Sequence, residues 1–188
     1  MRFSSDQIQK IENEISNKVD GKTLFDEFSR GRYSTDASVY QIKPLGVVLP
    51  KDTIDVLSLM EYSQKNSIPL LARGGGSSQC GQTVGESVVL DYSKHQNKIL
   101  ELNVEEKYVW VQPGVVLDHL NSFLKPYGLW FPVDVSTSSR ATIGGMSANN
   151  SCGSRSLYYG NMVHNVLAIE AILDDGSLPV SYTHLTLP

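Results

Sequence analysis

The amino-acid sequence predicts an α+β fold in which a β-α-β half is followed by a more antiparallel half. In the first half, residues 47–50 and 69–72 have the composition of short strands and bracket a helical pattern at residues 52–63. The second half begins with three short strand patterns joined by few residues, at 88–91, 98–102 and 108–112. Short connections favour antiparallel neighbours, because parallel strands need a long crossover.

The N-terminal residues 4–19 form the first predicted helix. Ser4 and Gln7 have the spacing of a capping box, and apolar residues recur at helical intervals as Ile8, Ile11, Ile15 and Val19. Residues 22–32 are polar, and we expect a loop there. We assign residues 1–31 to an N-terminal helical extension. The helix at 52–63 carries acidic residues in its first turn, where the helix dipole favours them.

A further helix is predicted from about Val115 to Tyr127, with Leu117, Leu120 and Leu124 on one face and Gly128 as its natural end.

Residues 166–173 form a nearly continuous apolar strand pattern that ends in the turn signal Asp174-Asp175-Gly176. A returning strand should follow, but residues 177–188 contain two prolines and no Asp, Glu, Lys or Arg. We expect these residues to be a non-native tail, with an irregular native strand as the alternative. We also expect the chain to stop within its domain.

The composition indicates a globular protein, with 188 residues, 40% hydrophobic and 19% charged. A net charge of -4 without a basic block argues against nucleic-acid binding. No apolar run reaches membrane-spanning length, and the N-terminus lacks the apolar core of a signal peptide. Two cysteines make neither a disulfide framework nor a metal site, so we expect a cytoplasmic protein without a metal. The histidines have no ligand spacing; they are His95, His119, His164 and His184.

Residues 73–85 have the sequence R-G-G-G-S-S-Q-C-G-Q-T-V-G, in which five of thirteen residues are glycine. A strand that enters such a turn can aim successive backbone N–H groups at an anion, and glycine lets a phosphate approach the main chain. The loop is not a P-loop, because no lysine lies between Lys65 and Lys94. It is not a Rossmann fingerprint either, because it leads into a strand. A flexible surface loop is the alternative.

Residues 132–160 form a second segment that is rich in Ser, Thr, Gly and Asn and poor in bulky side chains. Such a segment would make a poor core, but it suits a wall that is pressed against a flat, polar ligand. Together with the glycine loop, it indicates an extended ligand with a phosphate region and a ring region.

Five ordered motifs make the chain resemble the PCMH-type FAD-binding domain of the FAD-linked oxidases, the vanillyl-alcohol oxidase superfamily. It is similar to bacterial D-lactate, glycolate and D-2-hydroxyglutarate dehydrogenase-like proteins. The motifs are R-Y-S-T-D-A-S-V-Y at 32–40, A-R-G-G-G-S-S-Q-C-G-Q at 72–82, V-Q-P-G-V-V-L-D at 111–118, P-V-D-V-S-T-S-S-R-A-T-I-G-G-M-S-A-N-N-S-C-G-S at 132–154 and Y-G-N-M-V-H-N-V at 159–166. We assign residues 32–176 to a truncated domain of this kind. The resemblance implies two lobes, incomplete at the C-terminus, with FAD between them.

The resemblance also implies which residues bind FAD. The pyrophosphate contacts would come from Gly74, Gly75, Gly76, Ser77 and Ser78, with Gly81 and Gln82 near the same end. Residues 142–150 would run beside the pyrophosphate and the flavin ring. The candidates in this second region are Pro132, Thr142, Gly144, Gly145, Ala148, Asn149, Gly153, Ser154, Gly160 and, near the adenine, Ile169.

Ser77 stands where relatives with covalently attached FAD often carry histidine, so non-covalent FAD is expected. Cys152 is a conceivable second attachment point, but we expect it to be a buried, inert thiol and Cys80 to have a packing role. For His164 we expect a structural role.

The reaction implied by the resemblance is hydride transfer from a D-2-hydroxy acid to flavin N5, which gives the 2-oxo acid. In the family, the groups that hold and deprotonate the substrate belong largely to a C-terminal substrate domain. We therefore name no catalytic residue and expect the fragment to be inactive alone. Arg140 and Arg155 are expected to be surface or flavin-side residues rather than carboxylate clamps.

The expected partners are a small 2-hydroxy acid and an electron acceptor, which would be a quinone, a cytochrome or an electron-transfer flavoprotein. A location at the inner membrane face is compatible with this set. Two alternatives remain. One is another oxidase of the same fold, of the alditol oxidase or alkyl-ether lipid synthase type. The other is a non-catalytic nucleotide-binding module.

Overall fold

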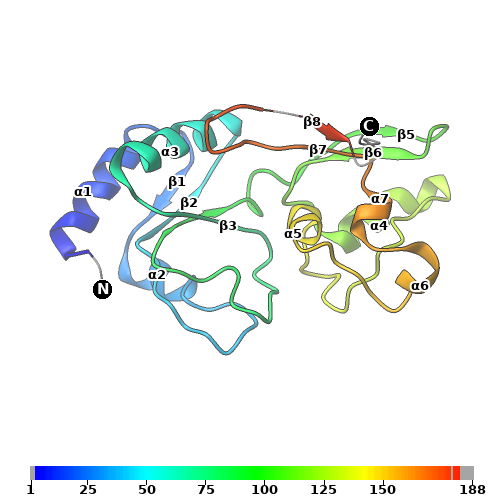
Figure 1. The fold of residues 1–188 in the computed structure, drawn as a ribbon, viewed down its shortest axis with the longest axis horizontal. Helices are drawn as coiled ribbons and strands as arrows, with labels where there is room; N and C mark the ends of the chain where they lie inside the picture. Colours follow the sequence, from blue (N-terminus) through cyan, green and yellow to red (C-terminus); the bar gives the residue numbers. More distant parts are fainter. Residues whose placement is uncertain (1–2, 179, 183–188) are drawn as a thin grey trace, which may run out of the picture. The chain divides into compact units, whose positions relative to one another are not determined.

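The computed structural model describes residues 3–178 and 180–182 (Figure 1). The chain forms two compact units, Met1–Gln96 and Asn97–Pro188. Within the described residues, no helix combines the length and the apolar character that crossing a membrane requires.

A four-stranded sheet forms the centre of the first unit, in the order β1-β2-β4-β3. Its strands are β1 (Lys22–Leu24), β2 (Gly46–Leu49), β3 (Leu70–Arg73) and β4 (Val88–Asp91). Strand β1 is antiparallel to β2, whereas β2 and β3 both run parallel to β4. Helix α3 (Thr53–Asn66) connects β2 to β3, so the predicted β-α-β crossover is confirmed.

Strand β4 lies between the two strands of that crossover, at the buried centre of the sheet. The sequence prediction grouped residues 88–91 with the later antiparallel strands, and this was wrong. The physical reason is the length of the connection, because residues 74–87 are long enough to carry the chain back for a second parallel pairing. The glycine loop is therefore itself a crossover connection.

Helix α1 (Ser5–Ser16) begins with the predicted capping box. The Gln7 N–H donates to Ser4 Oγ at 3.3 Å, and the Ser4 N–H donates to Gln7 Oε1 at 2.7 Å. The apolar stripe of this helix is buried, as its spacing predicts, at Ile8, Ile11 and Ile15.

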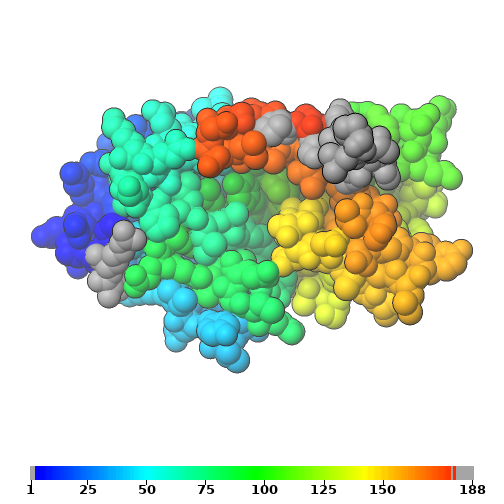
Figure 2. All heavy atoms as spheres, viewed as in Figure 1, coloured from blue at the N-terminus to red at the C-terminus, as the bar shows by residue number. Residues whose placement is uncertain are grey.

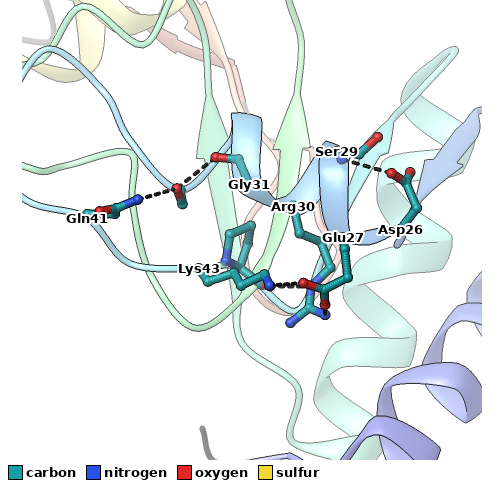
Figure 3. Close-up of polar contacts among 9 residues, drawn as sticks. Asp26, Glu27, Ser29, Arg30, Gly31, Gln41 and Lys43 are labelled. Carbon is teal, nitrogen blue, oxygen red and sulfur yellow. Dashed lines mark hydrogen bonds and ion pairs between the residues drawn. The ribbon is translucent and has the colours of Figure 1, made fainter.

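The loop predicted for residues 22–32 was wrong, because this segment forms β1 and helix α2 (Glu27–Arg32). Its polar side chains have specific partners, as Figure 3 shows. Asp26 caps α2 by accepting a hydrogen bond from the Ser29 N–H at 2.9 Å. Arg30 is 4% exposed, donates to the Pro44 carbonyl at 2.9 Å and pairs with Glu27. A polar composition here reflects caps and ion pairs.

The second unit begins with an antiparallel hairpin of β5 (Ile99–Asn103) and β6 (Tyr108–Val111), as predicted. Helix α4 (Leu117–Leu124) follows and continues as the 3-10 turn η1 (Lys125–Tyr127). Its predicted core face is confirmed, because Leu117, Leu120 and Leu124 are buried. The helical segment ends at Gly128, with a φ of 69°.

Three short helices follow in this unit, namely α5 (Ile143–Ala148), α6 (Ser156–Tyr159) and α7 (Met162–Asn165). The strand expected over residues 166–173 is shorter than predicted, since β7 covers only Ala168–Glu170. Its partner is β8 (Val180–Tyr182), which is equally short and antiparallel. A strand extends only as far as its hydrogen-bonding partner, which explains the difference. Residues 183–188, with His184, lie outside the described part of the chain.

Candidate functional site

The predicted site residues fall into two groups, one in each unit. The first group lies in the glycine loop between β3 and β4. Gly76 has a φ of 64°, in the left-handed region that favours glycine. In the part of the chain that the structure describes, the backbone N–H groups of residues 74–79 donate to no acceptor. Backbone donors need partners, so this run of N–H groups is available to a ligand.

The glycine loop is held by residues of the first motif, 32–40. The Ala37 N–H donates to the Gly76 carbonyl at 3.1 Å. The Thr83 hydroxyl donates to Asp36 Oδ2 at 3.0 Å. Burial opposes the ionisation of Asp36, but hydrogen bonds from Ser38 and Thr83 outweigh it, so the pKa of this carboxyl is lowered. The first and second motifs therefore form one structural element.

The distal half of the loop is closed by local contacts. Ser78 Oγ donates to Gln82 Oε1 at 2.8 Å and accepts from the Cys80 N–H at 3.1 Å. A Cβ on Gly81 would lie 2.6 Å from Tyr40 Cδ2, so the ring packs directly on this backbone. The packing role expected for Cys80 was wrong, because its side chain is exposed at the turn.

The second group begins at α5, whose glycines have partners within the chain. The Gly144 N–H donates to the Pro113 carbonyl at 2.9 Å, and a Cβ on Gly144 would lie 2.5 Å from Pro113 Cβ. The Gly145 N–H donates to Oγ1 of Thr142, the helix cap, at 3.4 Å. The third and fourth motifs are thus packed together. Because both glycine N–H groups are already bonded, the small size of these residues allows close backbone packing.

The next segment is organised around Asp134. Its carboxylate accepts hydrogen bonds from Ser154 Oγ at 2.8 Å and from the Arg155 N–H at 3.0 Å. The Arg155 guanidinium lies 5.2 Å from the Trp130 ring centroid, and its side chain is 60% exposed. Arg140 is also exposed. Both arginines have the surface placement expected for them.

A cavity of about 270 Å³ lies within the second unit. Its lining comes from three predicted segments, as Ser147, Asn150, Met162, Val163, Val166 and Ile169. Figure 2 shows α5 in yellow beside α7 in orange, the helices that supply Ser147 and Met162. Asn150 Oδ1 accepts from the Val163 N–H at 3.0 Å and so joins these segments.

The cavity contains residues that were missing from the prediction as well as the predicted Ile169. Met162, Val163 and Val166 belong to the motif Y-G-N-M-V-H-N-V, which supplied the signal for them. Two predicted residues at the end of α5, Ala148 and Asn149, do not line the cavity. Ala148 ends the helix, and the Asn149 side chain donates to the Gly145 carbonyl at 2.9 Å.

The remaining predicted residues have structural surroundings. Pro132 is half-buried ahead of Asp134. His164 Nδ1 accepts from the Asn161 N–H at 3.0 Å beside Gly160, which agrees with the structural role expected for this histidine. The expectation of a buried thiol at Cys152 was wrong, because this residue lies exposed in the connection between α5 and α6. The described residues contain no cluster of His, Cys, Asp or Glu that could hold a metal ion.

Both groups of predicted site residues lie within the region that matches a known protein family. The family model described as FAD binding domain matches residues 44–180. The chain belongs to this family of FAD binding domains. This membership confirms FAD as the cofactor predicted from the sequence.

Curated relatives of the chain are, by name, dehydrogenases and an oxidase of hydroxy acids. D-2-hydroxyglutarate dehydrogenase of Haemophilus influenzae is 43% identical over 148 residues, which are 77% of this chain and 14% of that protein. Glycolate oxidase subunit GlcD of Bacillus subtilis is 34% identical over 86% of this chain and 35% of its own length. D-lactate dehydrogenase [cytochrome] of Kluyveromyces lactis is 35% identical over 89% of this chain and 30% of its own length. The chain spans only 14–17% of the D-2-hydroxyglutarate dehydrogenases it matches.

Solved structures share the fold at low sequence identity. An alkyldihydroxyacetonephosphate synthase has a TM-score of 0.78 and 20% identity, over 98% of this chain and 36% of its own. The 6-hydroxy-D-nicotine oxidase of Arthrobacter nicotinovorans has a TM-score of 0.77 and 16% identity, over 89% of this chain and 37% of its own. These likenesses confirm the predicted α+β fold of FAD-linked oxidases.

Proposed function

We propose that the chain is the FAD-binding portion of a dehydrogenase that oxidises a D-2-hydroxy acid to the 2-oxo acid. The observation that carries the proposal is the run of free N–H groups at residues 74–79, in a chain that belongs to the FAD binding domains. Among the named relatives, D-2-hydroxyglutarate dehydrogenases are 39–43% identical, whereas the glycolate and D-lactate enzymes are 27–35% identical. D-2-hydroxyglutarate is therefore the substrate we favour.

The residues of the glycine loop fit the pyrophosphate of FAD. Two phosphate groups offer several anionic acceptor oxygens. A hydrogen bond from an N–H group to a charged acceptor is stronger than one between two uncharged groups. The N–H groups of residues 74–79 supply such donors without any change in existing backbone bonds. Ser77 cannot form the ring linkage that a histidine forms, so these residues would hold FAD without a covalent bond.

In the second unit, the cavity that includes Val163, Val166 and Ile169 offers apolar surface with two polar side chains, Ser147 and Asn150. This composition suits a flat aromatic ring with polar edges. We propose that the adenine of FAD binds there. Gly144 and Gly153 would contribute indirectly, because each keeps two backbone segments of the second unit close together. Thr142, Gly145 and Ser154 would lie beside the cofactor on this backbone.

When bound, FAD supplies a ring that accepts a hydride from the α-carbon of the hydroxy acid. We assign no general base and no carboxylate-binding residue to this chain. Because the matched region is only 14–17% of the length of the D-2-hydroxyglutarate dehydrogenases, we propose that these groups come from residues outside it. A quinone, a cytochrome or an electron-transfer flavoprotein in the cytoplasm or at the membrane face would reoxidise the flavin.

The proposal is tested with the full-length protein loaded with FAD. Under anaerobic conditions, D-2-hydroxyglutarate should bleach the flavin absorbance at about 450 nm, and L-2-hydroxyglutarate should not. D-Lactate and glycolate are the competing substrates, and faster bleaching by either would change the substrate assignment. Bleaching by an alditol, or by none of these compounds, would contradict a hydroxy-acid dehydrogenase.

A further inference from the structure

Arg73 lies at the end of β3, directly before the run of free N–H groups at residues 74–79. Its guanidinium donates to three carbonyl oxygens of two other segments. Nη1 bonds the carbonyls of Thr83 at 3.1 Å and Tyr33 at 3.3 Å, and Nη2 bonds that of Thr35 at 2.8 Å. One side chain therefore joins the beginning of the glycine loop to its distal part and to the first motif.

The guanidinium is itself fixed in place. It lies 5.2 Å from the centroid of the Tyr33 ring, and the Tyr33 hydroxyl donates to Asp91 Oδ2 at 2.6 Å. Burial, together with the bond to Asp91, raises the pKa of Tyr33 well above its ordinary value, so this hydroxyl stays a donor. Burial lowers the pKa of Arg73, and the nearby carboxylates of Asp91 and Asp36 oppose that effect. The Arg73 guanidinium nevertheless remains charged, because the pKa of an arginine lies far above neutral pH.

Gly76 bends the loop around this guanidinium. A Cβ on Gly76 would lie 2.6 Å from Arg73 Nη2 and 3.1 Å from Cζ. The Gly76 carbonyl accepts from Ala37, so the backbone cannot simply move away from the arginine. The glycine at this position is explained by its φ of 64° and by the space that Arg73 occupies.

We propose that Arg73 is a positioning residue for the cofactor. It sets the backbone of residues 74–79 so that their N–H groups stay free to bind the pyrophosphate, and it does so through the carbonyls of Tyr33, Thr35 and Thr83. Lysine cannot replace it, because an ammonium is a point charge and lacks the planar fork that reaches three acceptors. The inference rests on the proposed function, since it assumes that the loop binds a pyrophosphate.

The test compares Arg73→Lys with Arg32→Lys in the ¹⁵N-labelled full chain. Arg32 is an exposed arginine of the first motif, with its Cζ 5.9 Å from the Phe28 ring centroid, and is the matched control. ADP carries the pyrophosphate without the flavin and is the probe. In the wild type and in Arg32→Lys, the amide resonances of residues 74–79 should shift on addition of ADP. In Arg73→Lys, the same shifts should require an ADP concentration at least about tenfold higher. The resonances of α1 and α3 should keep their wild-type positions, which shows that the variant is folded.

Equal ADP responses in Arg73→Lys and Arg32→Lys would overturn the inference and leave the proposed function standing. If ADP and FAD shift no loop amide in the wild type, the proposed function fails and the inference with it. If Arg73→Lys loses its resonance dispersion, which would indicate unfolding, Gly76→Ala replaces it as the test variant. This change keeps Arg73, but the new methyl group would lie 2.6 Å from Arg73 Nη2 and displace the guanidinium. A loss of about tenfold in ADP affinity in Gly76→Ala supports the inference, and unchanged affinity overturns it.

Discussion

A Cβ on Gly153 would lie 1.3 Å from the carbonyl oxygen of Asp134, so these two backbone positions are in direct contact. The adjacent Ser154 hydroxyl and Arg155 N–H both donate to the Asp134 carboxylate. The contact joins the beginning and the end of the fourth motif. Gly153 is thus required by packing within the chain, independently of any bound cofactor.

Replacing Gly153 by alanine should lower the free energy of unfolding of the second unit by about 3 kcal/mol, because the new methyl group must displace backbone. Gly31→Ala is the control, since a Cβ there meets nothing within 4 Å and the residue lies inside α2. That change should be neutral or stabilise by up to about 1 kcal/mol. Urea unfolding followed by circular dichroism measures both. Similar stability of the two variants would refute the contact.

The neighbouring glycines of α5 should respond differently to the same change. A Cβ on Gly144 meets the Pro113 backbone, so Gly144→Ala should cost about 2 kcal/mol or more. At Gly145 the nearest atom is Thr142 Oγ1 at 3.2 Å, so Gly145→Ala should change stability by less than about 1 kcal/mol. Unfolding of both variants without ligand provides the measurement. A larger loss for Gly145→Ala would contradict the assigned packing.

Local signals were sufficient for much of the fold. The capping box at Ser4 and the spacing of Ile8, Ile11 and Ile15 indicated α1, and the glycines of residues 74–76 indicated a loop with free donors. These features depend on neighbours in the sequence. Their physical basis is visible without knowledge of the remaining chain.

Features that depend on distant partners were not predictable in this way. Arg30 is polar in the sequence but buried in the structure, because its partners include Pro44 as well as Glu27. Gly144 looked like a ligand-binding glycine, yet its Cβ space is filled by Pro113, which lies far away in the sequence. A single sequence does not say which distant residue fills such a space.

Asp55 should be important for the stability of the first unit. It is 3% exposed and accepts hydrogen bonds from the N–H groups of Asp20, Gly21 and Lys51 at 2.7–2.9 Å. Asp55→Ala leaves these N–H donors without their carboxylate acceptor and should lower the free energy of unfolding by about 3 kcal/mol or more. Asp52→Ala, which removes only the cap of α3, should cost about 1 kcal/mol. Thermal or urea unfolding measures both variants, and an equal loss of stability in Asp55→Ala and Asp52→Ala would contradict the hydrogen bonds of Asp55.

Asp134 should make the stability of the second unit sensitive to acid. The hydrogen bond donated by the Arg155 N–H lowers its pKa and, together with the bond from Ser154, outweighs the opposing effect of burial. A carboxyl whose pKa is lower in the folded state stabilises it above the unfolded pKa, and this stabilisation is lost as the pH falls below about 4. The unfolding midpoint should therefore drop more between pH 6 and pH 3 in the wild type than in Asp134→Asn. An identical drop would refute this.

Absorption spectroscopy of the chain after incubation with FAD and desalting shows whether these residues hold the cofactor without a covalent bond. We expect retained flavin bands near about 375 and 450 nm, and complete release of the flavin into the supernatant when the protein is denatured. Flavin that stays with the denatured chain would contradict non-covalent binding. A desalted chain without flavin bands, beside a full-length protein that also lacks them, would contradict FAD binding itself.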